Sequence, residues 1–197
     1  MFCFACTGGI GTGKSYVVRI FSALGIPAYI ADDRAKELYK IDRSLLDRLV
    51  EVLGDKIVVD GVLQKSVMAG IIFSNKELLM KVNQIVHPRL LEDFYEWRDE
   101  QEKRGVDMIV YESAIFLETP TFRSIADKVI VVTAPVDVRI RRVIKRDNIK
   151  EKLVKLRINK QWSDEKRLEM ADFVIFADGK RTVLPQILRI IDEVKKK

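Results

Sequence analysis

Residues 2–25, FCFACTGGIGTGKSYVVRIFSALG, decide the fold of this chain. The stretch opens with the apolar run FCFAC, which is typical of a strand buried on both faces of a sheet. A glycine cluster interrupts this run, and apolar residues at helical spacing follow it until Gly25, which ends the helix. The stretch therefore predicts a buried strand, a tight loop and a helix.

The loop GGIGTGKS (8–15) matches the pattern G-x-x-x-x-G-K-[ST] between a strand and a helix. Glycines let backbone N–H groups surround an anion, and the helix N-terminus adds partial positive charge. We expect Lys14 to reach the β- and γ-phosphates of a nucleoside triphosphate and Ser15 to ligate Mg²⁺. The predicted nucleotide-binding residues are Gly9, Ile10, Gly11, Thr12, Gly13, Lys14, Ser15 and Tyr16.

The loop alone does not separate a kinase from a GTPase, a motor ATPase or a regulatory nucleotide-binding module. The chain has no D-x-x-G, and NKQW (159–162) fails the guanine-binding pattern N-K-x-D at its last position. A motor ATPase is usually longer. The chain therefore favours a small-molecule or nucleoside kinase, with a non-catalytic regulatory module as the alternative.

The amino-acid composition limits the number of domains, the class of ligand and the cellular compartment. The 197 residues favour one domain, and 48% hydrophobic residues suffice for a sizeable core. The net charge of +6 suits anionic ligands, but the charge is scattered, so a small phosphorylated molecule is favoured over nucleic acid. Cys3 and Cys6 lie in a strand-like run and are expected to be buried reduced thiols, as in a cytoplasmic protein. The N-terminal apolar run is too short for a signal peptide or membrane span.

Strand-like runs alternate with helical patterns along most of the chain, which predicts an α/β fold with a parallel sheet flanked by helices. Further strands are expected at 27–31, 107–112, 127–134 and 171–177, and a small hairpin at the Asp60-Gly61 turn. Helices are expected at 34–53, 65–73, 75–86, 88–104, 135–146 and 181–195, and a charged helical stretch from about 146 to about 160. Pro88 is expected in the first turn of the helix at 88–104. The helical block at about 55–105 interrupts the alternation and is interpreted as an insert.

Asp32 and Asp33 follow the second strand, at the sheet edge where ligands bind in such folds. A carboxylate there can orient an attacking hydroxyl, and we assign this role to Asp32. Asp33 is expected to cap the following helix.

A series of motifs in order resembles dephospho-CoA kinase across nearly the whole sequence. The motifs are TGGIGTGKS (7–15), ADDRAKEL (31–38), GVLQKSVMAGIIF (61–73), VNQIVHPRL (82–90), ESAIFLE (112–118), RRVIKRD (141–147), RINKQ (157–161) and ADFVIFADG (171–179). The resemblance implies a P-loop NTPase fold with a core at about 1–54, 106–138 and 170–197, a helical acceptor-binding insert at about 55–105, and a lid at about 139–169. It implies ATP-dependent phosphorylation of the ribose 3′-hydroxyl of dephospho-CoA, the final step of coenzyme A biosynthesis.

The resemblance also implies residue roles. Asp32 corresponds to the family's base or hydroxyl-positioning group. We expect His87 to hydrogen-bond the acceptor or lock a turn before Pro88 rather than act as a base, and Glu118 to meet the acceptor or cap a loop. Glu112 stands where the family has Asp and is expected to hold Mg²⁺ with Ser15. The sequence departs from the family pattern at Ile30, Ala114 and Ala177.

The basic stretch late in the chain predicts a lid over the phosphates. Arg142 and Arg146 share one helix face, and Arg157 and Gln161 repeat that spacing. Arginine forks match the charge that develops on a transferring phosphoryl group. We therefore predict Lys14, Asp32, Arg142 and Arg146 as catalytic, and Asp32, His87, Glu118, Arg157 and Gln161 as acceptor-binding. For Arg139 and Arg141 a solvated helix with salt bridges is expected. The expected partner is the small-molecule acceptor alone, with no nucleic acid or membrane, in a cytoplasmic monomer or weak homo-oligomer.

Overall fold

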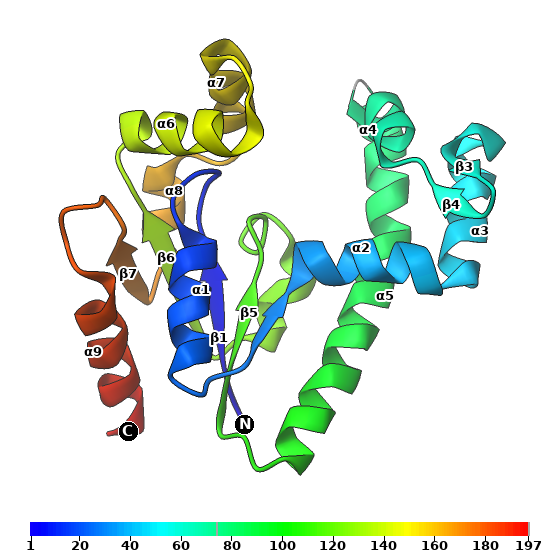
Figure 1. Cartoon of the computed structure of the whole chain (residues 1–197). Coiled ribbons are helices and arrows are strands. Elements are labelled where there is room, and N and C mark those ends of the chain that lie inside the picture. Colours follow the sequence, from blue (N-terminus) through cyan, green and yellow to red (C-terminus); the bar gives the residue numbers. More distant parts are fainter. Residues whose placement is uncertain (74, 197) are drawn as a thin grey trace. The chain divides into compact units, whose positions relative to one another are not determined.

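The computed structural model describes residues 1–73 and 75–196 (Figure 1). The chain forms two compact units, one of Met1–Tyr29 with Gln101–Lys197 and one of Ile30–Glu100. The second unit begins earlier than the predicted insert at about 55–105, whose borders stay a prediction.

The first unit is built on a five-stranded sheet with the order β2-β5-β1-β6-β7. The strands are β1 (Phe2–Thr7), β2 (Ala28–Ile30), β5 (Met108–Glu112), β6 (Lys128–Thr133) and β7 (Phe173–Phe176). Strand β1 pairs in parallel with β5 and β6, and β6 pairs in parallel with β7. Because β1 is central, its residues from Cys3 to Thr7 are buried, which explains its unbroken apolar run. The predicted parallel α/β fold is confirmed.

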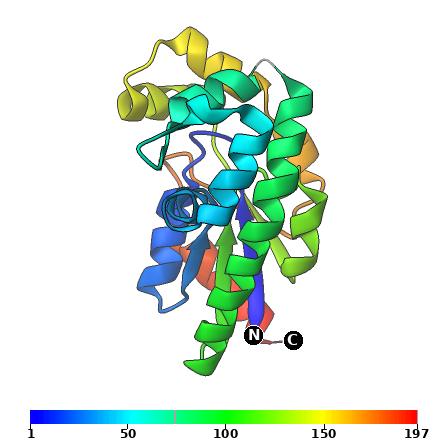
Figure 2. The ribbon, with the colours of Figure 1, turned by 90° about the vertical axis from the view of Figure 1, so that its right-hand side faces the viewer.

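Helices cover both faces of this sheet. Helix α1 (Lys14–Ala23) packs on β1 and β5 and against α9 (Val183–Lys195), which packs on β7. Helix α8 (Asp164–Leu168) packs on β6 and lies on the opposite side of the sheet from α1 (Figure 2). The short 3₁₀ helix η2 (Pro120–Ile125) follows β5. Helices α6 (Val136–Asp147) and α7 (Glu151–Asn159) pack together above the carboxyl ends of β1 and β6 (Figure 1).

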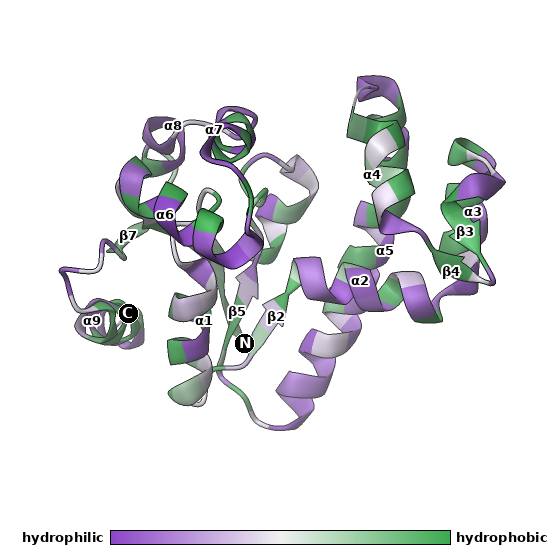
Figure 3. Cartoon of the chain, turned by 45° about the horizontal axis from the view of Figure 1, so that its top comes forward, coloured by the Kyte–Doolittle hydropathy of each residue, from purple (hydrophilic) through white to green (hydrophobic). Residues whose placement is uncertain are grey.

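The second unit is mainly helical. It contains α2 (Ala31–Ile41), α3 (Arg43–Leu53), the 3₁₀ helix η1 (Asp55–Ile57), β3 (Val58–Val59), β4 (Val62–Leu63), α4 (Lys65–Phe73) and most of α5 (Lys76–Lys103). Strands β3 and β4 form the predicted hairpin, with Asp60 at φ 50° and Gly61 at φ 76°. Positive φ at both turn positions suits a two-residue hairpin. Helix α4 is largely hydrophobic (Figure 3), yet Phe73 at its end is 72% exposed.

The predicted single helix at 34–53 is wrong, because Asp42 divides it into α2 and α3. Asp42 has extended backbone angles, and its side chain accepts a hydrogen bond from the Leu45 N–H at 2.9 Å. It also accepts one from Arg89 Nε at 2.7 Å. An aspartate that caps a helix competes with continuation of the preceding one, and the leucine spacing does not reveal this.

The predicted break before Pro88 is also wrong. Pro88 lies inside the single helix α5, where a proline removes one backbone hydrogen bond. A buried face runs past it, formed by Val82, Ile85, Val86, Leu90 and Phe94. The burial of this face outweighs the local cost of proline and carries the helix through. No helix of the described residues is long and apolar enough to cross a membrane.

Candidate active site

The glycine loop joins β1 to α1 and has the backbone that its sequence requires. Gly11 and Gly13 have φ values of 79° and 105°, a left-handed region that favours glycine. At Gly11 an added Cβ atom would also lie 2.7 Å from the Arg139 carbonyl oxygen. The glycine spacing therefore reflects both conformation and close packing.

Every carbonyl of the loop from Gly8 to Gly13 accepts a hydrogen bond from the chain. Three of these bonds come from the loop and α1: Lys14 Nζ to Gly8 O at 3.0 Å, Thr12 Oγ1 to Gly9 O at 2.9 Å, and Tyr16 N to Gly13 O at 3.0 Å. The other three come from α6: Arg139 Nε to Ile10 O at 2.9 Å, and Arg142 Nη1 to Gly11 O at 3.4 Å and Thr12 O at 3.1 Å. All six carbonyl oxygens are thus occupied by donors of the chain.

Several N–H groups of the loop, in contrast, have no hydrogen-bond partner in the part of the chain that the structure describes. Within residues 1–73 and 75–196, the N–H groups of Gly11, Gly13, Lys14 and Ser15 have no hydrogen-bond acceptor. The last two lie at the N-terminus of α1, where the helix dipole adds partial positive charge. Unpaired N–H groups at a helix N-terminus form an anion-binding site.

A pocket of about 320 Å³ opens beside these groups. Its lining is Gly11, Gly13, Lys14, Ser15, Tyr16, Arg19, Arg142, Val143, Arg146 and Ala177. It thus contains five of the eight predicted nucleotide-binding residues and both arginines that were predicted as catalytic. Gly9, Ile10 and Thr12 do not line it.

A buried carboxylate lies next to the loop lysine. Glu112, at the end of β5, is 7% exposed, and its Oε1 is 3.7 Å from Lys14 Nζ. Burial, and then the Glu112 charge, raises the pKa of the Cys6 thiol far above its usual range. Cys3 and Cys6 are both buried and free, as expected.

The predicted magnesium ligands fit the ion's chemistry. The Glu112 carboxylate and the Ser15 hydroxyl are oxygen donors from the two chain segments beside the anion-binding N–H groups. No group of three or more His, Cys, Asp or Glu side chains among the described residues is placed to hold a metal ion. Such a donor set suits Mg²⁺ that is bound mainly by phosphate oxygens and water.

Asp147 joins two arginines of the predicted lid: Arg146, predicted as catalytic, and Arg157, predicted to bind the acceptor. Its carboxylate accepts hydrogen bonds from Arg146 at 2.6 and 3.1 Å and from Arg157 at 3.0 Å. The Arg146 hydrogen bond is the main reason why the pKa of Asp147 lies below its ordinary value. Sequence reasoning missed Asp147, although it directly follows Arg146 at the end of α6.

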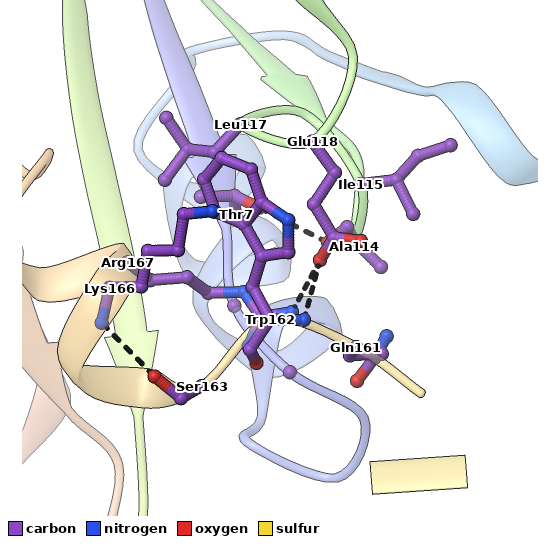
Figure 4. A network of polar contacts seen from close by, with 12 residues as sticks. Thr7, Ala114, Ile115, Leu117, Glu118, Gln161, Trp162, Ser163, Lys166 and Arg167 are labelled. Carbon is purple, nitrogen blue, oxygen red and sulfur yellow. Dashed lines mark hydrogen bonds and ion pairs between the residues drawn. The ribbon is translucent and has the colours of Figure 1, made fainter. Parts of the chain in front are cut away.

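A second polar network lies around Glu118 (Figure 4). Glu118 Oε1 accepts hydrogen bonds from Arg167 Nη2 at 2.7 Å and from the Trp162 N–H at 3.2 Å. Gln161, the other predicted acceptor-binding residue here, accepts the Ile10 N–H at 2.8 Å. The acceptor-binding roles of Glu118 and Gln161 stay predictions, but one oxygen of each already has a partner in the chain.

The expectation for Arg139 is wrong, whereas that for Arg141 is confirmed. Arg139 is 2% exposed and pairs with Asp164 at 2.8 Å, whereas Arg141 is exposed and pairs with Asp137 on its own helix. Arg167 is also buried, and nothing in its local sequence had singled it out. A charged residue on a helix gives no sequence signal that it is buried.

Asp32 and His87 belong to the second unit. Asp32 is exposed in the first turn of α2, and its charge adds to the burial that raises the pKa of Tyr39. His87 is half-buried on α5, and burial lowers its pKa, which favours the neutral imidazole. The expected cap role of Asp33 is wrong: the helix begins at Ala31, and Asp33 pairs with Lys36 at 2.6 Å.

Comparison with known proteins decides the family. A sequence profile of the dephospho-CoA kinase family matches residues 2–182. The chain belongs to the dephospho-CoA kinase family. A dephospho-CoA kinase of Bacteroides fragilis is 37% identical over 94% of this chain and 89% of its own length. One of Porphyromonas gingivalis is 36% identical over 100% and 96%, respectively.

Solved structures share the fold of this chain. A Thermus thermophilus protein of known structure matches this kinase with a TM-score of 0.85 at 25% identity, over 98% of this chain and 96% of its own. The Campylobacter jejuni dephospho-CoA kinase matches with a TM-score of 0.61 at 23% identity, over 99% and 98% of the two chains, which supports the fold alone. The predicted family, P-loop kinase fold and enzyme class are confirmed, and the chain is a kinase that transfers phosphate to an alcohol group.

Proposed function

We propose that this kinase transfers the γ-phosphoryl group of ATP to the ribose 3′-hydroxyl of dephospho-CoA, giving CoA and ADP in the last step of coenzyme A biosynthesis. Family membership supports the substrate and the reaction. The observation that carries the mechanism is the loop backbone, whose carbonyls are all paired while four N–H groups, at Gly11, Gly13, Lys14 and Ser15, have no acceptor among the described residues. Such a loop binds phosphate oxygens without rearranging its own hydrogen bonds.

Lys14 is assigned to the β- and γ-phosphates. Its ammonium contacts Gly8 O at 3.0 Å and Glu112 at 3.7 Å, so it is held beside the cradle before ATP arrives. Ser15 and Glu112 would hold Mg²⁺, which neutralises phosphate charge when bound. Arg142 and Arg146 line the same pocket and are assigned to the charge that develops during transfer.

The acceptor is assigned to the second unit, where Asp32 orients the attacking hydroxyl and His87 hydrogen-bonds the substrate. The exposed position of Asp32 in the first turn of α2 supports this role, because its carboxylate is accessible and has no cap function. A neutral His87 offers one donor and one acceptor to a polar substrate. Glu118 and Arg157 remain proposed acceptor contacts from the first unit, whereas the hydrogen bond that Gln161 accepts from the Ile10 N–H favours a role at the phosphate loop over its predicted acceptor contact.

We further propose that the enzyme acts in the cytoplasm as a monomer or weak homo-oligomer, without nucleic acid or membrane partners. The buried free cysteines support a reducing compartment. Light scattering after size exclusion tests the oligomeric state.

ADP release in the presence of different acceptors tests the function. We expect stimulation by dephospho-CoA but not by adenosine, nucleoside monophosphates or shikimate. Stimulation by one of those acceptors instead would identify another small-molecule kinase, and tight ATP binding without acceptor-dependent ADP would identify a regulatory module.

The neighbouring carboxylates test the role of Asp32. We expect Asp32→Asn to lower kcat by about 10²–10⁴-fold, the usual contribution of an acid–base group, with ATP affinity unchanged. Asp33→Asn is the matched control, because Asp33 is also exposed but pairs with Lys36. Equal losses in kcat and ATP affinity for Asp32→Asn would mean that Asp32 is structural.

A further inference from the structure

Ile10 in the phosphate loop is held on three sides by the segment that follows β6. Its N–H donates to Gln161 Oε1 at 2.8 Å, and its carbonyl accepts from Arg139 Nε at 2.9 Å. Its side chain packs against the buried cluster of Ile140, Val143 and Val154 in α6 and α7. One loop residue thus connects the loop to the core of the helical lid.

Arg139 fills the space beneath the loop. It is 2% exposed, and a Cβ atom added at Gly9 would collide with its guanidinium group. A buried cation is costly unless it is paired and hydrogen-bonded. Its partners are Ile10 O and Asp164, 2.8 Å away at the start of α8, so Arg139 joins the loop to that helix.

Gln161 is held in place by its neighbours in the turn between α7 and α8. The next N–H, that of Trp162, donates to Glu118, and Arg167 donates both to Glu118 and to the Trp162 carbonyl (Figure 4). Arg167 is 1% exposed and also lies 3.5 Å from Asp164. The turn therefore cannot leave the loop without breaking a buried polar network, which is costly.

We propose that Arg139 and Gln161 are positioning residues that fix both peptide groups of Ile10 and so preset the loop before nucleotide binds. A loop that is ordered in advance loses less conformational entropy on binding. The two side chains therefore increase affinity for the nucleotide phosphates, without touching the acceptor. The inference rests on the proposed function only in that the loop binds a nucleotide.

Binding of ADP, measured by calorimetry without acceptor, tests this proposal. For Gln161→Leu, which removes one neutral hydrogen bond, we expect the Kd of ADP to rise about 3- to 10-fold. For Arg139→Met we expect the Kd of ADP to rise about 10- to 100-fold, because hydrogen bonds from a charged donor contribute more than neutral ones. In Arg139→Lys, which keeps the charge, we expect part of the affinity for ADP to return. The KM of dephospho-CoA is expected to stay unchanged in Gln161→Leu.

Two variants control for general destabilisation. Ile149→Ala removes packing from the same lid cluster but leaves both hydrogen bonds to Ile10 in place, and Arg141→Met removes an exposed arginine from the same helix as Arg139. Both are expected to retain the wild-type Kd for ADP even where the melting temperature falls. An equal rise in Kd for Ile149→Ala and Gln161→Leu would overturn the proposal.

Hydrogen exchange of the Ile10 amide gives a direct readout. We expect protection in the nucleotide-free protein and its loss in Gln161→Leu. A raised KM for dephospho-CoA with an unchanged Kd for ADP would instead make Gln161 an acceptor contact and overturn the proposal. Gln161 is only half-buried, so this variant remains informative if Arg139→Met fails to fold. Because the binding assay needs no turnover, its result stands even if the kinase proves to use another acceptor.

Discussion

Cys6 lies in the apolar strand β1, beside the opposite charges of Lys14 and Glu112. Lys14 and Glu112 are 12% and 9% exposed at their side chains, and Cys6 is fully buried. Burial raises the pKa of the Cys6 thiol most, the Glu112 charge raises it further, and the Lys14 charge lowers it by less. The thiol therefore stays protonated in the folded kinase.

This environment predicts that the native enzyme resists thiol reagents. At pH 8 a free cysteine reacts readily, because its ordinary pKa is about 8.5. We expect iodoacetamide to label neither Cys3 nor Cys6 until denaturant is added, as counted by mass spectrometry. Rapid labelling of the native protein would contradict the buried position of β1.

For single residues, prediction from sequence depends on whether a residue type has one dominant use in its motif. Lys14 and Ser15 follow directly from the loop pattern, and the structure places both at the pocket. Arg139 and Arg167 were missed because a charged residue is usually exposed, and only the three-dimensional arrangement supplies the partners that allow burial.

Among the helices, the division between α2 and α3 depends on one side chain. Asp42 caps α3 through the Leu45 N–H and pairs with Arg89 of α5. Asp42→Ala removes both contacts, and we expect the free energy of unfolding to fall by about 1–2 kcal/mol, the usual range for a lost cap. Urea denaturation measures this change, and Asp47→Ala, on the exposed face of α3, is the matched control.

The same residue predicts a pH dependence of stability. The Leu45 N–H, and then Arg89, hold the pKa of Asp42 below its ordinary value. The unfolded chain therefore takes up the proton first as the pH falls below about 4. The contribution of Asp42 is complete above that pH and is lost as the pH falls through the lower, folded-state pKa. Asp42→Ala should abolish this part of the acid dependence, and an unchanged profile would contradict the cap.

The two errors in the predicted helix borders, at Asp42 and before Pro88, have a common cause. The strands and the hairpin were found because their signals are local. The border between α2 and α3 depends in part on the bond of Asp42 to Arg89, which is far away in the sequence. The continuity of α5 through Pro88 depends on the burial of one face of that helix against the rest of the protein. Periodicity within one segment carries no information about such contacts.

For the whole molecule, the net charge of +6 favours encounter with two anionic substrates. Raising the salt concentration from about 0.1 M to about 1 M shortens the Debye length from about 10 Å to about 3 Å. We expect kcat/KM for ATP and for dephospho-CoA to fall over this range. Melting temperatures at both concentrations serve as the control for intact fold, and unchanged kcat/KM values would show that encounter does not depend on charge.

The order of strands in the sheet has a consequence for biosynthesis on the ribosome. Strand β1 is synthesised before both neighbouring strands, because its pairing partners Met108 and Lys128 follow more than a hundred residues later. At a synthesis rate of about 5–20 residues per second, the segment FCFACT waits roughly 5–20 s without a partner strand. The second unit, Ile30–Glu100, is completed during this interval. An apolar strand that emerges so long before its partner strands is expected to bind chaperones that recognise nascent chains.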